Sequence, residues 1–295
     1  GGIYVTNNLS NGITSTWTKL SNPPRTEGHP ASIFILNDGK VVCTFSGRRN
    51  SGGTFTASSG VFIYDPALSS WTDVSDAGMY YWTKDITIDP NDPAQNTWYA
   101  AVFSGWGGAP NGLGGLYKTI NRGALWTKLT GSQFDRVTSI TFNPQNLNQG
   151  FLTTETQGLW ISSDMNATTP SWTLVSSYPF RQPERVFFNP YNNDEIWVTS
   201  FGNGMKVGSM LNNNIVSFTE SKNNIAIHPN PSNGSFIIKT KSFSGNNVLN
   251  IFNETGQLIY SKIINDESTL INNKDWKNGL YFVKYQNEYF KLLKM

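Results

Sequence analysis

Residues 115–129, GLYKTINRGALWTKL, decide the fold of this chain. A glycine opens an apolar strand, a polar turn follows, and a tryptophan opens a second short strand. The same order recurs at other places in the sequence, with phenylalanine replacing tryptophan in the weakest copy: residues 2–20, 60–74, 158–175 and 204–218. A unit that recurs in this way predicts a repeat architecture in which each copy packs against the next.

A second pair of strands lies between successive copies. The pairs are residues 86–90 with 97–100, 140–144 with 151–154, and 186–190 with 196–199. Four strands in roughly 45 to 55 residues is the period of a β-propeller blade. We therefore predict an all-β chain in which residues 1–221 form a partial β-propeller of about four and a half four-stranded blades.

The start of the chain bears on how complete this propeller is. Counting gives half a blade and then four whole blades, whereas propellers close with about four to eight. Residues Gly1 to Tyr4 have neither the charged start nor the apolar core of a signal peptide. We expect the chain to be a fragment that lacks upstream blades and part of any active site.

Residues 222–295 have a different pattern, with three turn-forming phrases that each lead into a strand. The phrases are HPNPSNG at 228–234, NETGQ at 253–257 and NGLYFVK at 278–284. Proline fixes φ, asparagine and glycine tolerate positive φ, and alternating β-branched or aromatic residues follow. We predict a small, immunoglobulin-like antiparallel β-sandwich here.

In this order these phrases closely resemble the C-terminal sorting domain of the bacterial type IX secretion system. The resemblance implies contact with the type IX machinery and export to the surface or medium of a Gram-negative, Bacteroidetes-type cell. An accessory carbohydrate-binding sandwich is the alternative. The resemblance implies that the sorting signal includes Pro229, Asn230, Pro231, Asn233, Gly234, Gly256, Gln257, Asn278 and Gly279.

Composition narrows the classes of function. Charged residues make up 14% of the chain and the net charge is +2, so we expect no nucleic-acid partner. Cys43 is the only cysteine and lies in an apolar run, which predicts a buried thiol. With two histidines, His29 and His228, the chain has no multi-histidine metal site, and we expect no cofactor. No apolar stretch reaches membrane-spanning length, so we expect no transmembrane segment.

The blade turns resemble those of the Asp-box propellers, which include sialidases, sortilin-type receptors and glycoside hydrolases of family 74. One box is residues 119–126, with Asn121 where aspartate is usual, and a looser copy contains Asp164 before Trp172. The resemblance implies that Asn121 and Asp164 cap backbone donors and have no catalytic role.

A further acidic cluster, Asp89-Pro90-Asn91-Asp92, suggests either calcium binding or a capped turn. The motif recurs as Asn143-Pro144 and Asn189-Pro190, and this recurrence favours the capped turn.

Propeller topology sorts the remaining polar residues by face. The loop that enters the first strand of a blade and the loop between its second and third strands share one rim, where propellers normally bind ligands. Charged and aromatic residues recur on this predicted rim in successive blades: Glu27, His29, Arg48, Arg49, Tyr80, Tyr81, Trp82, Lys84, Asp85, Trp106, Asp135, Arg136, Glu155, Arg181, Gln182, Glu184, Arg185 and Asn203.

Such a mixture suits sugar binding, since rings stack on sugar faces and planar polar groups bind hydroxyls or carboxylates. The predicted binding residues are Trp82, Trp106, Tyr81, Arg136, Arg181, Arg185 and Arg48. Glu155 stands where the family 74 resemblance implies a catalytic aspartate, and Asp135, Asp85 or Glu184 is its candidate partner in a two-carboxylate glycosidase. For each carboxylate, an ion pair between blades is an equal alternative.

Three functions stay open. In the first, the propeller binds extracellular polysaccharide and, as one hypothesis, also hydrolyses it. The alternatives are a non-catalytic surface propeller that binds glycan or protein, and a sialidase-like enzyme that uses several arginines to hold an acidic sugar.

Overall fold

The computed structural model describes residues 1–105, 109–211, 215–217, 225–240, 247–286 and 288–295. These residues divide into two compact units, Gly1–Thr219 and Glu220–Met295. The predicted boundary between residues 221 and 222 lies in 218–224, outside the described residues, and stays a prediction. Within the described ranges, no helix is long and apolar enough to cross a membrane.

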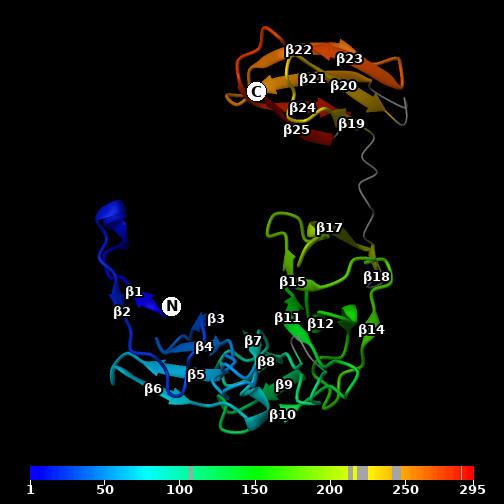
Figure 1. The fold of residues 1–295 in the computed structure, drawn as a ribbon. Helices are drawn as coiled ribbons and strands as arrows, with labels where there is room; N and C mark the ends of the chain where they lie inside the picture. Colours follow the sequence, from blue (N-terminus) through cyan, green and yellow to red (C-terminus); the bar gives the residue numbers. More distant parts are fainter. Residues whose placement is uncertain (106–108, 212–214, 218–224, 241–246, 287) are drawn as a thin grey trace. The chain divides into compact units, whose positions relative to one another are not determined.

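The first unit contains a two-stranded sheet and then four antiparallel four-stranded sheets, in chain order (Figure 1). Two short 3₁₀ turns, η1 (Leu9–Thr14) and η2 (Ala77–Met79), lie in its connections. The sheets confirm the predicted half blade and four blades of a β-propeller.

The strands are β1 (Tyr4–Val5) and β2 (Thr18–Lys19); β3 (Pro30–Ile35), β4 (Val41–Phe45), β5 (Gly60–Asp65) and β6 (Ser70–Asp73); β7 (Thr83–Ile88), β8 (Trp98–Val102), β9 (Gly115–Thr119) and β10 (Thr127–Lys128); β11 (Val137–Asn143), β12 (Asn146–Thr154), β13 (Gly158–Ser162) and β14 (Thr173–Leu174); β15 (Pro183–Phe188), β16 (Glu195–Ser200), β17 (Gly204–Leu211) and β18 (Ile215–Ser217).

Strand β8 shows how the blades pack, because both of its faces are buried. Its even-numbered side chains, including Trp98, join a core cluster with Val42 and Val61 of the preceding sheet. Its odd-numbered side chains, including Tyr99, join a second cluster with Ile140 of the following sheet. Successive side chains of a strand point to opposite faces, so each inner blade is covered on both sides.

Side-chain hydrogen bonds also connect the first strands of neighbouring blades. Thr87 Oγ1 donates to the carbonyl of Ile140, at 3.0 Å, and so connects β7 to β11. Thr141 Oγ1 donates to the carbonyl of Val186, also at 3.0 Å, and connects β11 to β15. Repetition of the same contact from blade to blade fixes the spacing of the first strands.

The box turn between β9 and β10 is held by its own side chains. Asn121 Oδ1 accepts from Thr119 Oγ1 at 2.8 Å and from the backbone N–H of Leu125 at 2.9 Å. Trp126 donates from Nε1 to the carbonyl of Val74 in the preceding blade, at 2.7 Å. Gly123 has a φ of +85°, and a Cβ there would lie 2.8 Å from the Val74 side chain.

The second box turn and the proline turns are also capped. Asp164 accepts hydrogen bonds from Ser162 Oγ and from the backbone N–H of Ser171. Asp89 Oδ1 accepts from the N–H of Asn91 at 2.8 Å, and equivalent caps are made by Asn143 to Gln145 and by Asn189 to Tyr191. These polar side chains satisfy turn backbone, as the sequence predicted.

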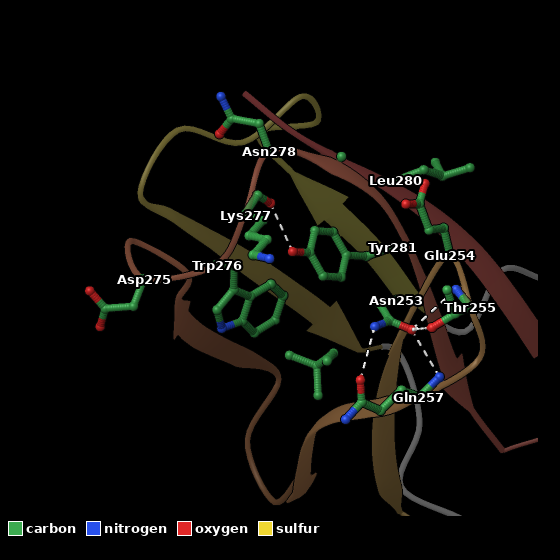
Figure 2. Close-up of a pocket in the computed structure, with 12 residues that line it drawn as sticks. Asn253, Glu254, Thr255, Gln257, Asp275, Trp276, Lys277, Asn278, Leu280 and Tyr281 are labelled. Carbon is green, nitrogen blue, oxygen red and sulfur yellow. Dashed lines mark hydrogen bonds between the residues drawn. The ribbon is translucent and has the colours of Figure 1, made fainter.

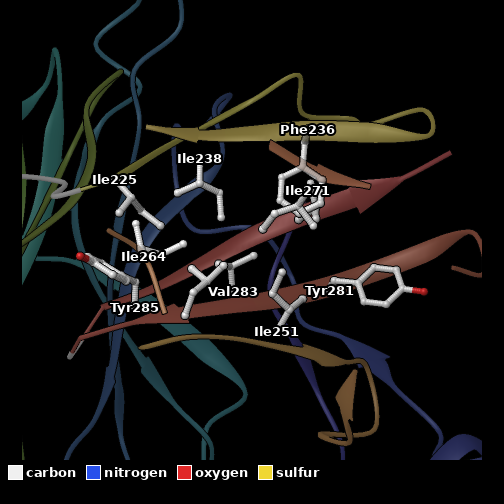
Figure 3. Close-up of a cluster of buried hydrophobic side chains, with 11 residues drawn as sticks. Ile225, Phe236, Ile238, Ile251, Ile264, Ile271, Tyr281, Val283 and Tyr285 are labelled. Carbon is white, nitrogen blue, oxygen red and sulfur yellow. The ribbon is translucent and has the colours of Figure 1, made fainter. Parts of the chain in front are cut away.

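The second unit is a sandwich of a three-stranded and a four-stranded antiparallel sheet, with strand orders β19-β20-β23 and β22-β21-β24-β25. Both sheets contribute to one apolar core, which includes Phe236, Ile238, Ile251 and Val283 (Figure 3). The fold confirms the predicted C-terminal β-sandwich. The strands are β19 (Ile225–His228), β20 (Ser235–Thr240), β21 (Val248–Asn253), β22 (Leu258–Ile263), β23 (Ser268–Asn272), β24 (Gly279–Tyr285) and β25 (Glu288–Lys294).

We predict that Asn121→Ala destabilises the propeller, because it removes an acceptor that holds two donors of the box turn. The free energy of unfolding should fall by about 1 kcal/mol, measured by urea unfolding of the whole chain. Ile120→Ala is the matched control, since its side chain is 71% exposed in the same turn. Equal stability of the Asn121→Ala and Ile120→Ala variants would contradict a structural role for the box asparagine.

Candidate functional site

All four first strands of the blades carry a register shift near their start. The shifts fall between Pro30 and Ser32, Thr83 and Asp85, Val137 and Ser139, and Pro183 and Arg185. Each shift leaves one extra residue without a partner in the second strand, which is the signature of a β-bulge. A bulge turns the side chain that it carries out of the regular alternation. The extra residues are Ala31, Lys84, Thr138 and Glu184.

Two of these bulges bring opposite charges together between the second and fourth blades. Lys84 Nζ lies 2.8 Å from Glu184 Oε2, although the residues are 100 positions apart in the sequence. The next residue of each strand forms a second pair, with Arg185 Nη2 2.5 Å from Asp85 Oδ1. One strand carries a basic and then an acidic residue, Lys84 and Asp85, and the other carries an acidic and then a basic residue, Glu184 and Arg185. Both ion pairs can therefore form at the same time.

Asp85 is the buried member of this group. Its side chain is 1% exposed, whereas that of Arg185 is 39% exposed. Burial raises the pKa of the Asp85 carboxyl above its ordinary value of 3.8, because the charged form loses its hydration. The positive charge of Arg185 opposes this shift.

A third ion pair lies within the third blade. Arg136 Nη1 donates to Glu155 Oε2 at 2.6 Å, and both side chains are 18% exposed. A second nitrogen of the same guanidinium donates to the carbonyl of Gly105 at 2.8 Å, and its carbon lies 5.7 Å from the centre of the Phe103 ring. Arg136 thereby joins the second and third blades.

Lys84, Glu184 and Glu155 line a cavity of about 230 Å³ on the predicted rim, whereas Asp85, Arg136 and Arg185 are not among its lining residues. Its aromatic residues are Trp82, Phe103 and Phe201, with Trp82 and Phe103 ring centres 5.9 Å apart. Its polar residues are Lys84, Glu155, Gln182 and Glu184. The cavity therefore combines apolar ring faces with planar polar groups.

Phe103 and Phe201 are binding candidates that the sequence interpretation missed. Each directly follows the second strand of its blade, and its backbone N–H donates to the residue before the first strand: Phe103 to Trp82 and Phe201 to Gln182. Glu155 makes the same bond to Arg136. The repeat alone contains this signal, since the three residues occupy one position of the blade.

Other predicted site residues lie elsewhere. Arg48 lines a separate cavity of about 250 Å³ with Glu27 and His29. Tyr81 makes an edge-to-face contact with Phe55, with ring centres 5.8 Å apart. Asp135 and Arg181 do not line the cavity that contains Trp82. Trp106 lies outside the described residues.

Six of the charged rim residues thus form three ion pairs. The alternative of an ion pair between blades describes Asp85 and Glu184, while Glu155 pairs inside its own blade. Across the described ranges of the chain, no group of three or more histidine, cysteine or acidic residues is placed to hold a metal ion. The thiol of Cys43 is buried, as its apolar sequence neighbours predicted.

Residues 226–294 match the family described as the secretion system C-terminal sorting domain. The second unit is therefore a type IX sorting domain, and the protein is exported to the surface or exterior of a Gram-negative cell of the Bacteroidetes type. No curated protein matches the sequence.

Solved structures resemble the fold of the chain at low sequence identity. PorZ of Porphyromonas gingivalis, described as an essential bacterial surface component of the type IX secretion system, has 13% identity and a TM-score of 0.45 over 95% of this chain and 48% of its own. A family 74 xyloglucanase of Xanthomonas campestris has 13% identity and a TM-score of 0.47 over 94% and 39%. An ancestral family 74 enzyme has 16% identity and a TM-score of 0.52 over 94% and 36%. The chain spans less than half the length of each, and the likeness concerns fold alone.

We predict that burial of Asp85 makes the stability of the propeller depend on pH. Its raised pKa means that its contribution to folding is fully present below about pH 3.8 and is lost as pH rises through the folded pKa. Asp85→Asn should remove this loss, so the variant gains stability relative to the wild type as pH rises, by about 1.4 kcal/mol for each unit of pKa shift.

Urea unfolding of both proteins across this pH range measures the difference. Asp194→Asn, at an exposed turn on the opposite rim, controls for the loss of one carboxylate. A difference between Asp85→Asn and wild type that does not change with pH would contradict the prediction.

Proposed function

We propose that the propeller is a non-catalytic, carbohydrate-binding module, exported by the type IX system, that binds extracellular polysaccharide at the rim cavity. The observation that carries the proposal is the lining of that cavity. Aromatic rings of Trp82, Phe103 and Phe201 surround it together with Lys84, Gln182 and two glutamates.

This lining matches the chemistry of a sugar. The C–H face of a pyranose ring is apolar and packs on an aromatic ring, while its edge presents hydroxyls that need hydrogen-bond partners. Gln182 offers both a donor and an acceptor, and Lys84 donates only. A volume of about 230 Å³ fits one or two sugar rings of a longer chain that continues along the exposed rim.

Binding is favoured over hydrolysis by what the carboxylates already contact. A glycosidase needs one carboxyl group that donates a proton to the leaving oxygen. Glu155 Oε2 and Glu184 Oε2 instead accept hydrogen bonds from Arg136 and Lys84. Asp85 has the raised pKa that a proton donor requires, but its side chain is 1% exposed and does not line the cavity.

The sialidase alternative requires several arginines around one substrate carboxylate. Arg136 and Arg185 are each paired with a carboxylate of the protein, and Arg48 lines a different cavity. A neutral or weakly acidic polysaccharide is therefore the preferred ligand class.

We predict that Trp82→Ala lowers affinity for the bound polysaccharide at least ten-fold, which corresponds to about 1.4 kcal/mol. The measurement is affinity electrophoresis of the whole chain in gels that contain neutral or acidic polysaccharides. Tyr191→Ala is the control, because Tyr191 is 96% exposed in a turn between a first and a second strand, on the opposite rim. Retention by no polysaccharide, or equal retention of both variants, would refute the proposed site.

Hydrolysis is tested separately with the polysaccharide that is retained. We expect no release of reducing ends above the buffer level from wild-type protein, and no change with Glu155→Gln. Release that is lost in Glu155→Gln would instead establish the glycoside hydrolase hypothesis.

A further inference from the structure

Two of the three turn phrases of the sorting domain line a single cavity. The cavity measures about 440 Å³, and both Asn253–Gln257 and Asn278–Tyr281 contribute to it. Figure 2 shows the rings of Trp276 and Tyr281 side by side in this cavity, with centres 5.0 Å apart. The phrases are more than 20 residues apart in the sequence, so turn formation alone does not explain why they meet.

Internal contacts hold the wall of this cavity in place. Asn253 Oδ1 accepts from the backbone N–H groups of Thr255 and Gln257, and Tyr281 donates from its hydroxyl to the carbonyl of Lys277 at 2.8 Å. Trp276 also packs against Phe236 of the other sheet. The cavity is therefore formed before any partner arrives, which lowers the entropy cost of binding.

Strand β22 borders the cavity and is an open edge of the four-stranded sheet. It is the terminal strand in the order β22-β21-β24-β25, and no described strand pairs with its outer side. Its residue Ile259 has no partner in the register with β21, because Ile251 pairs with Tyr260 and Phe252 with Leu258. This bulge places Ile259 in the cavity lining, while Leu258 remains 51% exposed.

The opposite edge of the same sheet, strand β25, is covered by the remaining turn phrase, residues 228–234. Ser232 forms a parallel bridge with Lys294 of β25, and its N–H donates to the carbonyl of Leu293. Asn230 donates from Nδ2 to the carbonyl of Lys291 at 2.7 Å and accepts from the N–H of Leu293 at 2.9 Å. Proteins usually protect sheet edges in this way, so the uncovered apolar edge at β22 indicates a place for another strand.

The charges beside the cavity indicate what that strand carries. Glu254 and Asp275 are exposed cavity residues with no ion-pair partner in the part of the chain that the structure describes, and Lys277 is the one basic residue of the lining. The mouth therefore has an excess of one negative charge and favours a basic side chain in its occupant.

We propose that the edge of β22 and the cavity beside Trp276 form the docking surface for an extended segment of the type IX machinery. The segment adds a strand to β22, inserts an apolar side chain beside Trp276 and Ile259, and places a basic side chain near Glu254 and Asp275. Main-chain hydrogen bonds supply affinity in this mode and the pocket supplies specificity. The proposal rests on the role of residues 226–294 as a sorting domain.

Charge reversal at exposed positions tests the surface without disturbing the core. The whole chain with Glu254→Lys and Asp275→Lys is expressed in a cell with type IX secretion, and the exported fraction is measured. We expect at least a ten-fold loss of export. The matched control reverses Asp266 and Glu267, which are exposed in the turn at the far end of β22 and do not line the cavity. Unchanged thermal unfolding of the purified variants shows that both have folded.

A photo-crosslinking residue at position 259 identifies the contact during export. The expected adduct joins the chain to an outer-membrane component of the secretion system and disappears with the double reversal at 254 and 275. The same probe at Tyr289, on the covered β25 side, should give no adduct. Normal export of the double reversal, or equal crosslinking from both positions, overturns the docking surface. A chain without residues 225–295 serves as the reference. Export of this truncated chain would overturn the sorting role itself. If the truncated chain is not exported, a negative result with the double reversal contradicts only the proposed docking surface.

Discussion

The rim of the propeller depends on one backbone constraint, a β-bulge at the second residue of every first strand. The regular alternation of a strand places successive side chains on opposite faces, where they pack between blades. One extra residue breaks this alternation and gives a side chain a third direction. Lys84 and Glu184 meet through this device, and the two strands are then close enough for Asp85 and Arg185 to pair as well.

This arrangement decides what the rim is able to do. Three carboxylates that looked like catalytic candidates have basic partners at 2.5 to 2.8 Å. Two of them, Glu155 and Glu184, line a cavity with aromatic walls, and we propose that they accept hydrogen bonds from sugar hydroxyls there. Because these carboxylates are ion-paired, we propose that the cavity binds a sugar and does not cleave it. In the sorting domain, two of the turn phrases likewise have a second role, since they line the cavity beside Trp276 as well as turning the chain.

The sequence predicted those features that depend on local periodicity. Glycine, an apolar strand, a polar turn and tryptophan recur in each blade, so the number and order of the strands were predictable. The roles of Asn121 and Asp164 followed from the box pattern, because a turn cap needs only neighbours in sequence. The bulges were not predictable in this way, since Ala31, Lys84, Thr138 and Glu184 share neither charge nor shape. Contacts over 100 residues, such as Lys84 with Glu184, depend on the register of strands in different blades.

We propose that the rim binds polysaccharide and leaves it intact. The most direct measurement incubates the purified chain with a polysaccharide that retains it in affinity electrophoresis, and then determines the length of the recovered polymer by size-exclusion chromatography and mass spectrometry. We predict retention that is lost in Trp82→Ala, together with a polymer of unchanged length. Shortened polymer or released oligosaccharides, formed by wild type and not by Glu155→Gln, would contradict it.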